Sequence, residues 1–155
     1  MATIVTSIEV DVPVPAAYNQ WTQFESFPEF MDGVEKVVQL DQTRLRWTAK
    51  LGGRQMDWDA RITEQIPDVR VAWTSTEGPR NGGAVDFHRL DDRQTLIVLV
   101  METEPEGLVE SLGDHLGLVR RRVENDLERF KGFIESRGSE TGAWRGEVPA
   151  PHHRG

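Results

Sequence analysis

The chain has 155 residues, 37% of them hydrophobic and 28% charged, which is typical of one folded domain and not of a disordered protein. Its formal net charge of −8 repels the phosphates of nucleic acids and of anionic lipids, so we expect no nucleic-acid partner. The absence of cysteine excludes disulfides and cysteine-bound zinc. With neither a signal-peptide pattern nor an apolar stretch of roughly 20 residues, the sequence predicts a cytoplasmic protein without a transmembrane segment.

The first two thirds of the chain predict a strand, short helices and then a series of strands. Apolar and polar residues alternate in residues 4–12, as in a half-buried strand. Residues 16–31 place large apolar side chains three or four apart, which predicts helical turns broken at Pro28 that plug one end of the core. Further strands are predicted at residues 34–40, 45–51, 55–66, 69–76, 83–90 and 95–103. Seven strands joined by tight turns predict an antiparallel meander.

The alternation within these strands assigns one face of the sheet to the core. Apolar residues, including three of the five tryptophans, occupy one side, and charged residues occupy the other. The residues assigned to the buried face are Leu45, Trp47, Ala49, Met56, Trp58, Ala60, Ile62, Val69, Val71, Trp73, Val85 and Phe87. We expect the charged face to meet water.

A long helix is predicted near the C-terminus. Its apolar residues recur every three or four positions along one stripe, which needs the apolar face of the sheet to cover it. The stripe consists of Leu112, Leu116, Val119, Val123, Leu127, Phe130 and Ile134. The sequence therefore predicts an α+β fold in which a curved seven-stranded antiparallel sheet wraps a long C-terminal helix, with two short helices after the first strand. We expect this domain to span residues 1–138.

Residues 139–155 are rich in glycine and proline and contain a single aromatic residue, Trp144. One large apolar group offers little against the cost of ordering a segment, about 1–2 kcal/mol per residue. We therefore expect a flexible tail that contributes little to stability.

Several stretches resemble the START-like (SRPBCC) helix-grip superfamily. This superfamily includes polyketide cyclase/dehydrase and lipid-transport proteins, coenzyme Q-binding proteins and the birch pollen allergen group. The matching stretches are Val12-Pro13 with Trp21, Phe27-Pro28-Glu29-Phe30-Met31 before Gly33-Val34, Ile66-Pro67 before Val71-Ala72-Trp73, and residues 126–131. Residues 140–146 (ETGAWRG) are also similar to an ending found in some bacterial members. The resemblance implies an elongated cavity between sheet and helix that holds a lipid, quinone or polyketide, but it implies no single chemistry.

The candidate ligand-binding residues come from the apolar face of the sheet and from the helix stripe, because drug-sized pockets are typically lined by such side chains. They are Trp47, Trp58, Trp73, Phe87, Leu112, Leu116, Val119 and Val123. Each of them could equally belong to a filled core. If a void lies there, Leu116→Trp and Ala60→Phe should weaken ligand binding more than folding.

Signals for catalysis are sparse, and we predict no catalytic residue, no metal site and no cofactor. The paired carboxylates Asp57 and Asp59 alternate with apolar residues and therefore point to solvent. Asp114 and His115 diverge by about 100° on a helix, too far for an acid–base dyad. The arginines in residues 120–122 point three ways, and a solvated face is the simpler interpretation.

Two functions follow. The first is a binding protein for a small hydrophobic molecule such as a lipid, quinone or polyketide. The alternative is a polyketide aromatase/cyclase that acts in the same cavity and needs inward-facing polar groups. The resemblance implies an arginine in such sites, but Arg61 falls on the outer face by alternation. Gln65 and Ser75 could face inward, although neither is a strong acid or base.

Overall fold

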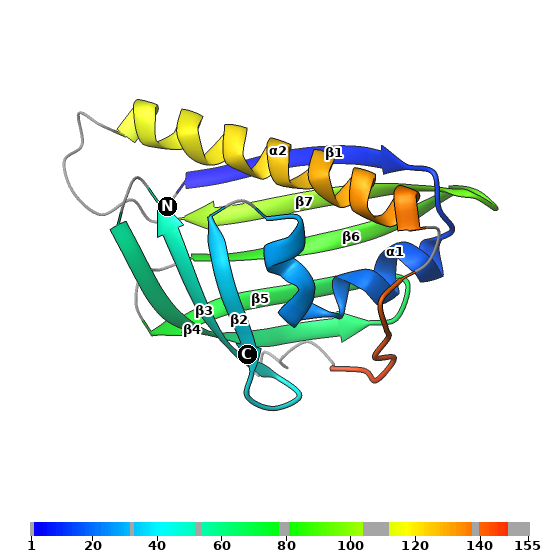
Figure 1. The fold of residues 1–155 in the computed structure, drawn as a ribbon, viewed down its shortest axis with the longest axis horizontal. Helices are drawn as coiled ribbons and strands as arrows, with labels where there is room; N and C mark the ends of the chain where they lie inside the picture. Colours follow the sequence, from blue (N-terminus) through cyan, green and yellow to red (C-terminus); the bar gives the residue numbers. More distant parts are fainter. Residues whose placement is uncertain are drawn as a thin grey trace, which may run out of the picture.

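In a computed structural model, seven antiparallel strands form a sheet that curves around a C-terminal helix (Figure 1). The structure describes residues 2–31, 33–51, 54–77, 81–103, 112–137 and 140–148. The strands are β1 (Ala2–Val10), β2 (Val34–Gln39), β3 (Arg44–Leu51), β4 (Arg54–Ile66), β5 (Arg70–Glu77), β6 (Asn81–Asp91) and β7 (Gln94–Thr103), in the spatial order β1-β7-β6-β5-β4-β3-β2. The helices are α1 (Val14–Trp21), the 3-10 helix η1 (Phe24–Glu29) and α2 (Leu112–Arg137). The predicted helix-grip fold is therefore confirmed.

The longest strand, β4, gives the sheet part of its curvature. Its 13 residues pair with β5 in three stretches, with register shifts between Asp59 and Ala60 and between Ile62 and Glu64. Such bulges bend a strand and increase its local twist. Alternation along the sequence predicted this strand but did not locate the bulges, because the inward-facing residue after Ile62 is the polar Gln65, which does not continue the apolar pattern.

An aromatic cluster fills the end of the core next to α1. Trp21 packs edge-on against Phe130 of α2 at a ring distance of 5.0 Å, and Phe30 packs against the same ring at 5.2 Å. Phe27 continues the cluster at 5.6 Å from Trp21. These rings are at most 4% exposed, and edge-on pairs add about 0.5–1.5 kcal/mol each beyond the burial of their area. This is the plug that the spacing of residues 16–31 predicted, and we call it the closed end.

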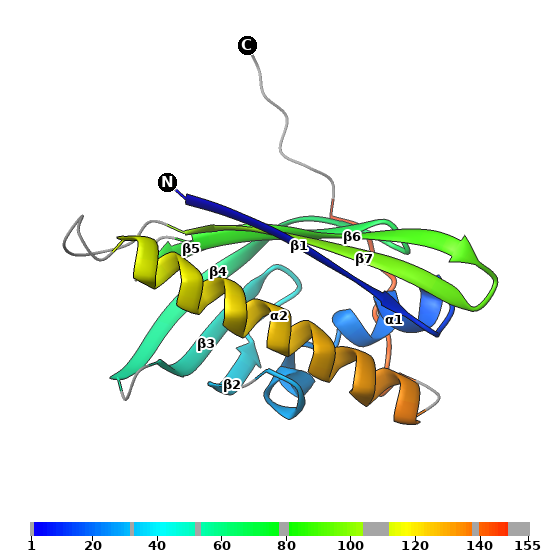
Figure 2. The same ribbon diagram turned by 90° about the horizontal axis from the view of Figure 1, so that it is seen from above.

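Helix α2 lies on the concave side of the sheet and runs beside β1 (Figure 2). Its described apolar stripe is buried, from Val123 at 7% exposed to Ile134 at 0%. The helix also contacts the outer edge of β1, where Arg120 donates to the carbonyl oxygen of Val5 at 3.3 Å and Lys131 to that of Glu9 at 3.0 Å. None of the described helices is long and apolar enough to cross a membrane.

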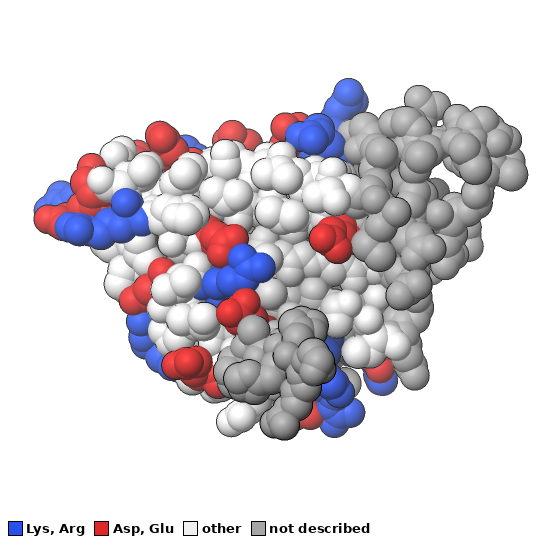
Figure 3. Space-filling view, turned by 180° about the vertical axis from the view of Figure 1, so that it is seen from behind, with Lys and Arg blue, Asp and Glu red and all other residues white. Residues whose placement is uncertain are grey.

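The convex face of the sheet is only partly charged. Arg70 binds Glu64 at 2.9 Å and Asp86 at 2.8 Å there, as the sequence led us to expect. On β7, however, Leu96, Val98 and Val100 alternate with the buried Ile97 and Leu99 and so face outward, and much of this surface carries no charged side chain (Figure 3). The charged outer face predicted from the preceding strands does not extend across β7, because β7 is apolar on both sides.

Val69 is a second correction. It was assigned to the buried face, but it lies in the turn between β4 and β5 and is 49% exposed. The turn is made at Asp68, whose φ of 65° is left-handed, and β5 begins only at Arg70. Residues of this turn do not obey the alternation of the strand that follows.

The structure gives residues 140–148 a defined place along α1, which differs from the flexible tail expected for this stretch. Thr141 accepts the Gln20 amide at 3.1 Å and donates its own N–H to Gln20 at 2.8 Å. Farther on, Val148 pairs with Gln65 through two backbone hydrogen bonds of 2.7 and 2.8 Å. Apolar periodicity could not reveal this docking, because most of the partners are polar.

Candidate functional site

Three of the predicted ligand-binding residues share the concave face of the sheet. Trp47 of β3 and Trp58 of β4 are cross-strand partners whose rings are parallel, 5.8 Å apart and inclined by 5°. Trp73 of β5 packs against the same core. All three rings remain half-buried, while residues on the same face such as Leu45 and Val71 are at most 1% exposed. The tryptophans therefore keep part of their apolar surface open.

The Trp73 ring is held flat against the neighbouring strand by a glycine. Trp73 pairs with Gly83 of β6, and a Cβ atom at Gly83 would lie 2.8 Å from Cζ2 of the ring and 2.6 Å from the carbonyl oxygen of Val100. Only a residue without a side chain leaves room for the ring in this position. The next residue in the row, Met101 of β7, is also half-buried. We call the surface formed by Trp47, Met56, Trp58, Trp73 and Met101 the open face.

The other predicted residues divide into two groups. Phe87 is 5% exposed and packs edge-on against Tyr18 at 5.5 Å and Trp21 at 6.4 Å, so it belongs to the closed end. Val123 is 7% exposed and lies in the same core cluster. Leu112, Leu116 and Val119 fall within α2, but their side chains lie outside the described part of the structure.

Arg122 on α2 is a polar group of this region that the sequence analysis placed, together with Arg120 and Arg121, on a solvated face. Arg120 and Arg121 are exposed, whereas Arg122 is half-buried and lies against Gly33 at the start of β2. Gly33 has a φ of +87°, and a Cβ there would collide with the guanidinium group. The three arginines thus point three ways as predicted. Arg122 is more buried than a solvated face implies, because it sits one position beside the apolar stripe, while Arg61 is exposed as expected.

Several buried polar atoms on the concave side have no well-formed hydrogen bond among the described residues. They are Nε1 of Trp47, the hydroxyl of Tyr18 and both amide atoms of Gln65. Burial raises the pKa of Tyr18, while the nearby Gln65 amide and Arg145 guanidinium act in the opposite direction. Gln65 faces inward and is 1% exposed, whereas Ser75 is half-buried and accepts a hydrogen bond from the backbone of Asn81.

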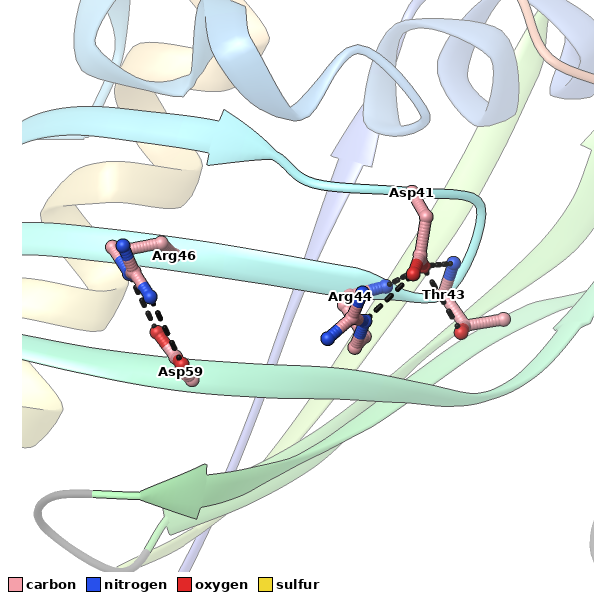
Figure 4. Close-up of polar contacts among 5 residues, drawn as sticks. All are labelled: Asp41, Thr43, Arg44, Arg46 and Asp59. Carbon is pink, nitrogen blue, oxygen red and sulfur yellow. Dashed lines mark hydrogen bonds and ion pairs between the residues drawn. The ribbon is translucent and has the colours of Figure 1, made fainter.

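The paired carboxylates lie away from the open face. Asp57 is exposed, and Asp59 binds Arg46 across β3 and β4 at 2.8 Å (Figure 4). The hydrogen bond from Arg46 lowers the pKa of Asp59. Both residues have the solvent-facing position that alternation predicted, so their contacts are structural.

A separate carboxylate, Asp41, organises the turn between β2 and β3. It accepts hydrogen bonds from the backbone N–H groups of Thr43 and Arg44, both at 2.9 Å, and from the Arg44 side chain (Figure 4). These donors, the Arg44 side chain first, lower the pKa of Asp41 from 3.8 to about 2. Within the described ranges, no group of three histidine or carboxylate side chains is placed to hold a metal ion.

A hollow of about 280 Å³ lies on the convex face. It is lined by Arg70, Trp73, Thr74, Gly82, Gly83, Ala84, Val100 and Glu102. Arg70, Thr74 and Val100 alternate with the core residues of their strands, which puts the mouth of the hollow on the side away from α2. The hollow therefore opens on the opposite side of the sheet from the open face, although Trp73 borders both.

Known proteins show the same fold and one shows close sequence similarity. The chain is 54% identical over 149 residues to an uncharacterized 17.2 kDa protein of Streptomyces lincolnensis from the melC2-rnhH intergenic region, covering 96% of this chain and 99% of that one. The Zhui aromatase/cyclase of Streptomyces sp. R1128 has 19% identity and a TM-score of 0.74, with 92% of this chain and 99% of that chain covered. A START superfamily protein of Mycobacterium smegmatis has 12% identity and a TM-score of 0.75, with coverages of 87% and 98%.

The two structural likenesses establish the fold, and the family follows from the sequence. The model of the family described as polyketide cyclase/dehydrase and lipid transport matches residues 10–131, most of the chain. That stretch contains the closed end, the tryptophans of the open face and most of α2. The chain therefore belongs to the polyketide cyclase/dehydrase and lipid-transport family.

Proposed function

We propose that the protein binds a small hydrophobic molecule, such as a lipid, quinone or polyketide, against the open face on the concave side of the sheet. The observation that carries the proposal is the contrast in burial along this side. Rings of the closed end are at most 5% exposed, whereas Trp47, Trp58 and Trp73 are half-buried although they point to the same side. The description of the family supports this class of ligand.

The physical basis is the apolar surface that a ligand would cover. Removing apolar area from water is worth about 25 cal/mol per Å², so a ligand that covers three half-buried indole rings gains affinity without any charged contact. The unpaired Nε1 of Trp47 adds a hydrogen-bond donor. The best ligand is therefore apolar and carries an acceptor such as a carbonyl or hydroxyl oxygen.

The five tryptophans provide a direct test. Trp47, Trp58 and Trp73 belong to the open face, whereas Trp21 lies in the closed end and Trp144 in the C-terminal segment. Single Trp→Phe variants should be titrated with oleate, decylubiquinone and an anthraquinone while Trp emission is recorded. The change in emission should shrink in the Trp47, Trp58 and Trp73 variants and persist in the Trp21 and Trp144 variants. Unchanged emission and melting temperature with all three compounds would refute the proposal.

A polyketide aromatase/cyclase acting at the same face is the second candidate. It is favoured by two hydrogen-bond donors of this region, Nε1 of Trp47 and the guanidinium of Arg122, which could polarise a ketone oxygen. Closure would join a methylene carbon to a carbonyl carbon and then release one water molecule. Incubation with a poly-β-ketone made by a minimal polyketide synthase tests it. Altered ring products should depend on Arg122 and survive Arg121→Ala, and identical products with and without the protein would exclude this function.

The cellular location and the class of partner are also proposals. We place it in the cytoplasm, since a chain without cysteine gains nothing from an oxidising compartment. The net charge of −8 argues against a nucleic-acid partner.

A further inference from the structure

The polar side of α1 is buried, which is unusual for a short helix at the surface of a domain. Asn19, Gln20 and Thr22 are at most 9% exposed. Buried polar side chains need hydrogen-bond partners. The partners come from residues 140–148, which we call the strap: Gln20 exchanges two hydrogen bonds with Thr141, and Thr22 Oγ1 accepts the N–H of Trp144 at 3.1 Å. The strap therefore covers the face of α1 that the aromatic core does not.

Arg145 connects the strap to two parts of the fold, α1 and the β4–β5 turn. Its Nη1 donates to Oδ1 of Asn19 at 2.6 Å, and its Nη2 binds Oδ2 of Asp68 in the β4–β5 turn at 2.7 Å. The guanidinium carbon also lies 5.6 Å from the centre of the Tyr18 ring. The planar guanidinium group of Arg145 donates to two acceptors and lies against a ring face at the same time. The ammonium group of a lysine cannot make these three contacts together.

The end of the strap completes the sheet where β3 stops short. The pairing of β3 with β4 begins at Arg44 and Arg61, so the last residues of β4 have no β3 partner. Val148 occupies this edge and exchanges two backbone hydrogen bonds with Gln65. An unpaired edge next to a buried glutamine would otherwise be open to another chain.

The helix has few other local supports. It has eight residues, no side-chain bond at its N-cap and no acidic residue in its first turn, and helices of this length are marginal on their own. Its aromatic side chains nevertheless build the closed end, since Tyr18 and Trp21 both contact Phe87.

We propose that the strap holds α1 in place as a latch, and that Arg145 is the residue that positions it. By fixing α1, the strap would set how far an apolar ligand can penetrate toward the closed end. The statement about α1 stands alone, and the statement about ligand depth rests on the proposed function. With the strap released, α1 loses the partners of its polar face and the aromatic plug loosens.

The test uses the full chain with Arg145→Ala and Arg145→Lys. Arg121→Ala is the matched control, because it removes the same charge from an exposed position on α2. We expect both Arg145 variants to speed hydrogen exchange of the α1 amides at least about tenfold, and to lower the melting temperature by about 5 °C, with no change in the control. As a second pair, deletion of residues 140–155 should reproduce the effect, and deletion of residues 149–155 should not.

Oleate titration of the same variants separates the two claims. Weaker or altered oleate binding in Arg145→Ala, with normal binding in Arg121→Ala, supports the control of ligand depth. Oleate affinity identical in both variants overturns that part. If the intact chain binds no oleate, decylubiquinone or anthraquinone, the proposed function fails, and hydrogen exchange still decides on the latch. The latch is wrong if exchange in α1 and the melting temperature of Arg145→Ala match those of Arg121→Ala.

Discussion

Replacing Ala60 with phenylalanine tests whether the open face on β4 ends before Ala60, as the burial of this residue indicates. The sequence suggested a void that would accept this ring, but Ala60 is 1% exposed and pairs with Leu45, which is equally buried. Added bulk at a packed site typically costs about 1–3 kcal/mol, which lowers the melting temperature of a domain of this size by about 2–12 °C. We therefore expect Ala60→Phe to destabilise the protein, the opposite of the expectation drawn from the sequence.

Met56→Trp is the matched control for this substitution. Met56 lies on the same strand and on the same face toward β3, where it pairs with Ala49, but it is half-buried. Its enlargement should change the melting temperature by less than about 2 °C, because a partly open site accepts volume. Thermal unfolding followed by circular dichroism measures both variants. An Ala60→Phe protein that melts like the parent chain would show that free space reaches Ala60 and that our boundary between open face and closed end is misplaced.

Two further predictions concern the backbone and pH. Gly33→Ala should destabilise by about 1–2 kcal/mol, because its φ of +87° is left-handed and a Cβ would displace Arg122; Gly132→Ala, at a helical site with nothing within 4 Å, should stabilise by about 0.5–1 kcal/mol. Urea unfolding of both variants would contradict this reasoning if the two changes had the same sign. Asp41 has a pKa lowered from 3.8 to about 2, so its contribution is present above pH 3.8 and is lost as pH falls through about 2. Asp41→Asn should therefore be less stable than the parent at pH 7 and approach it near pH 2, and a difference independent of pH would count against the Asp41 contacts.

The regular elements could be predicted because each repeats a short pattern. Alternation located the strands to within a few residues, and the stripe from Val123 to Ile134 located α2. The same rule assigned no faces in β7, which is apolar on both sides, and it failed where a turn precedes a strand, as at Val69. It also placed Phe87 on the correct face without showing that the space beside this ring is filled by Tyr18 and Trp21.

The polar residues around the candidate site and under the strap were harder to predict, because their contacts are with distant segments. Arg122 lies against Gly33, roughly 90 positions earlier, and Gln20 bonds to Thr141, which follows it by 121 positions. A pattern within one helix contains no information about such partners. Two signals were nevertheless present: polar residues on a helix whose other side is aromatic, and an arginine next to a tryptophan in an otherwise simple tail.

The contacts between α2 and β1 cover the outer edge of an edge strand. Arg120 and Lys131 occupy the carbonyl groups of Val5 and Glu9, which would otherwise be available to pair with a strand of another molecule. Val5 is itself 53% exposed, so the uncovered edge would be apolar as well as unpaired. A ligand that entered by swinging α2 away from the sheet would thus expose the protein to aggregation at every exchange. For the proposed ligand, entry that leaves the helix in contact with β1 would avoid this hazard, so the route of entry and the resistance to aggregation would depend on the same contacts.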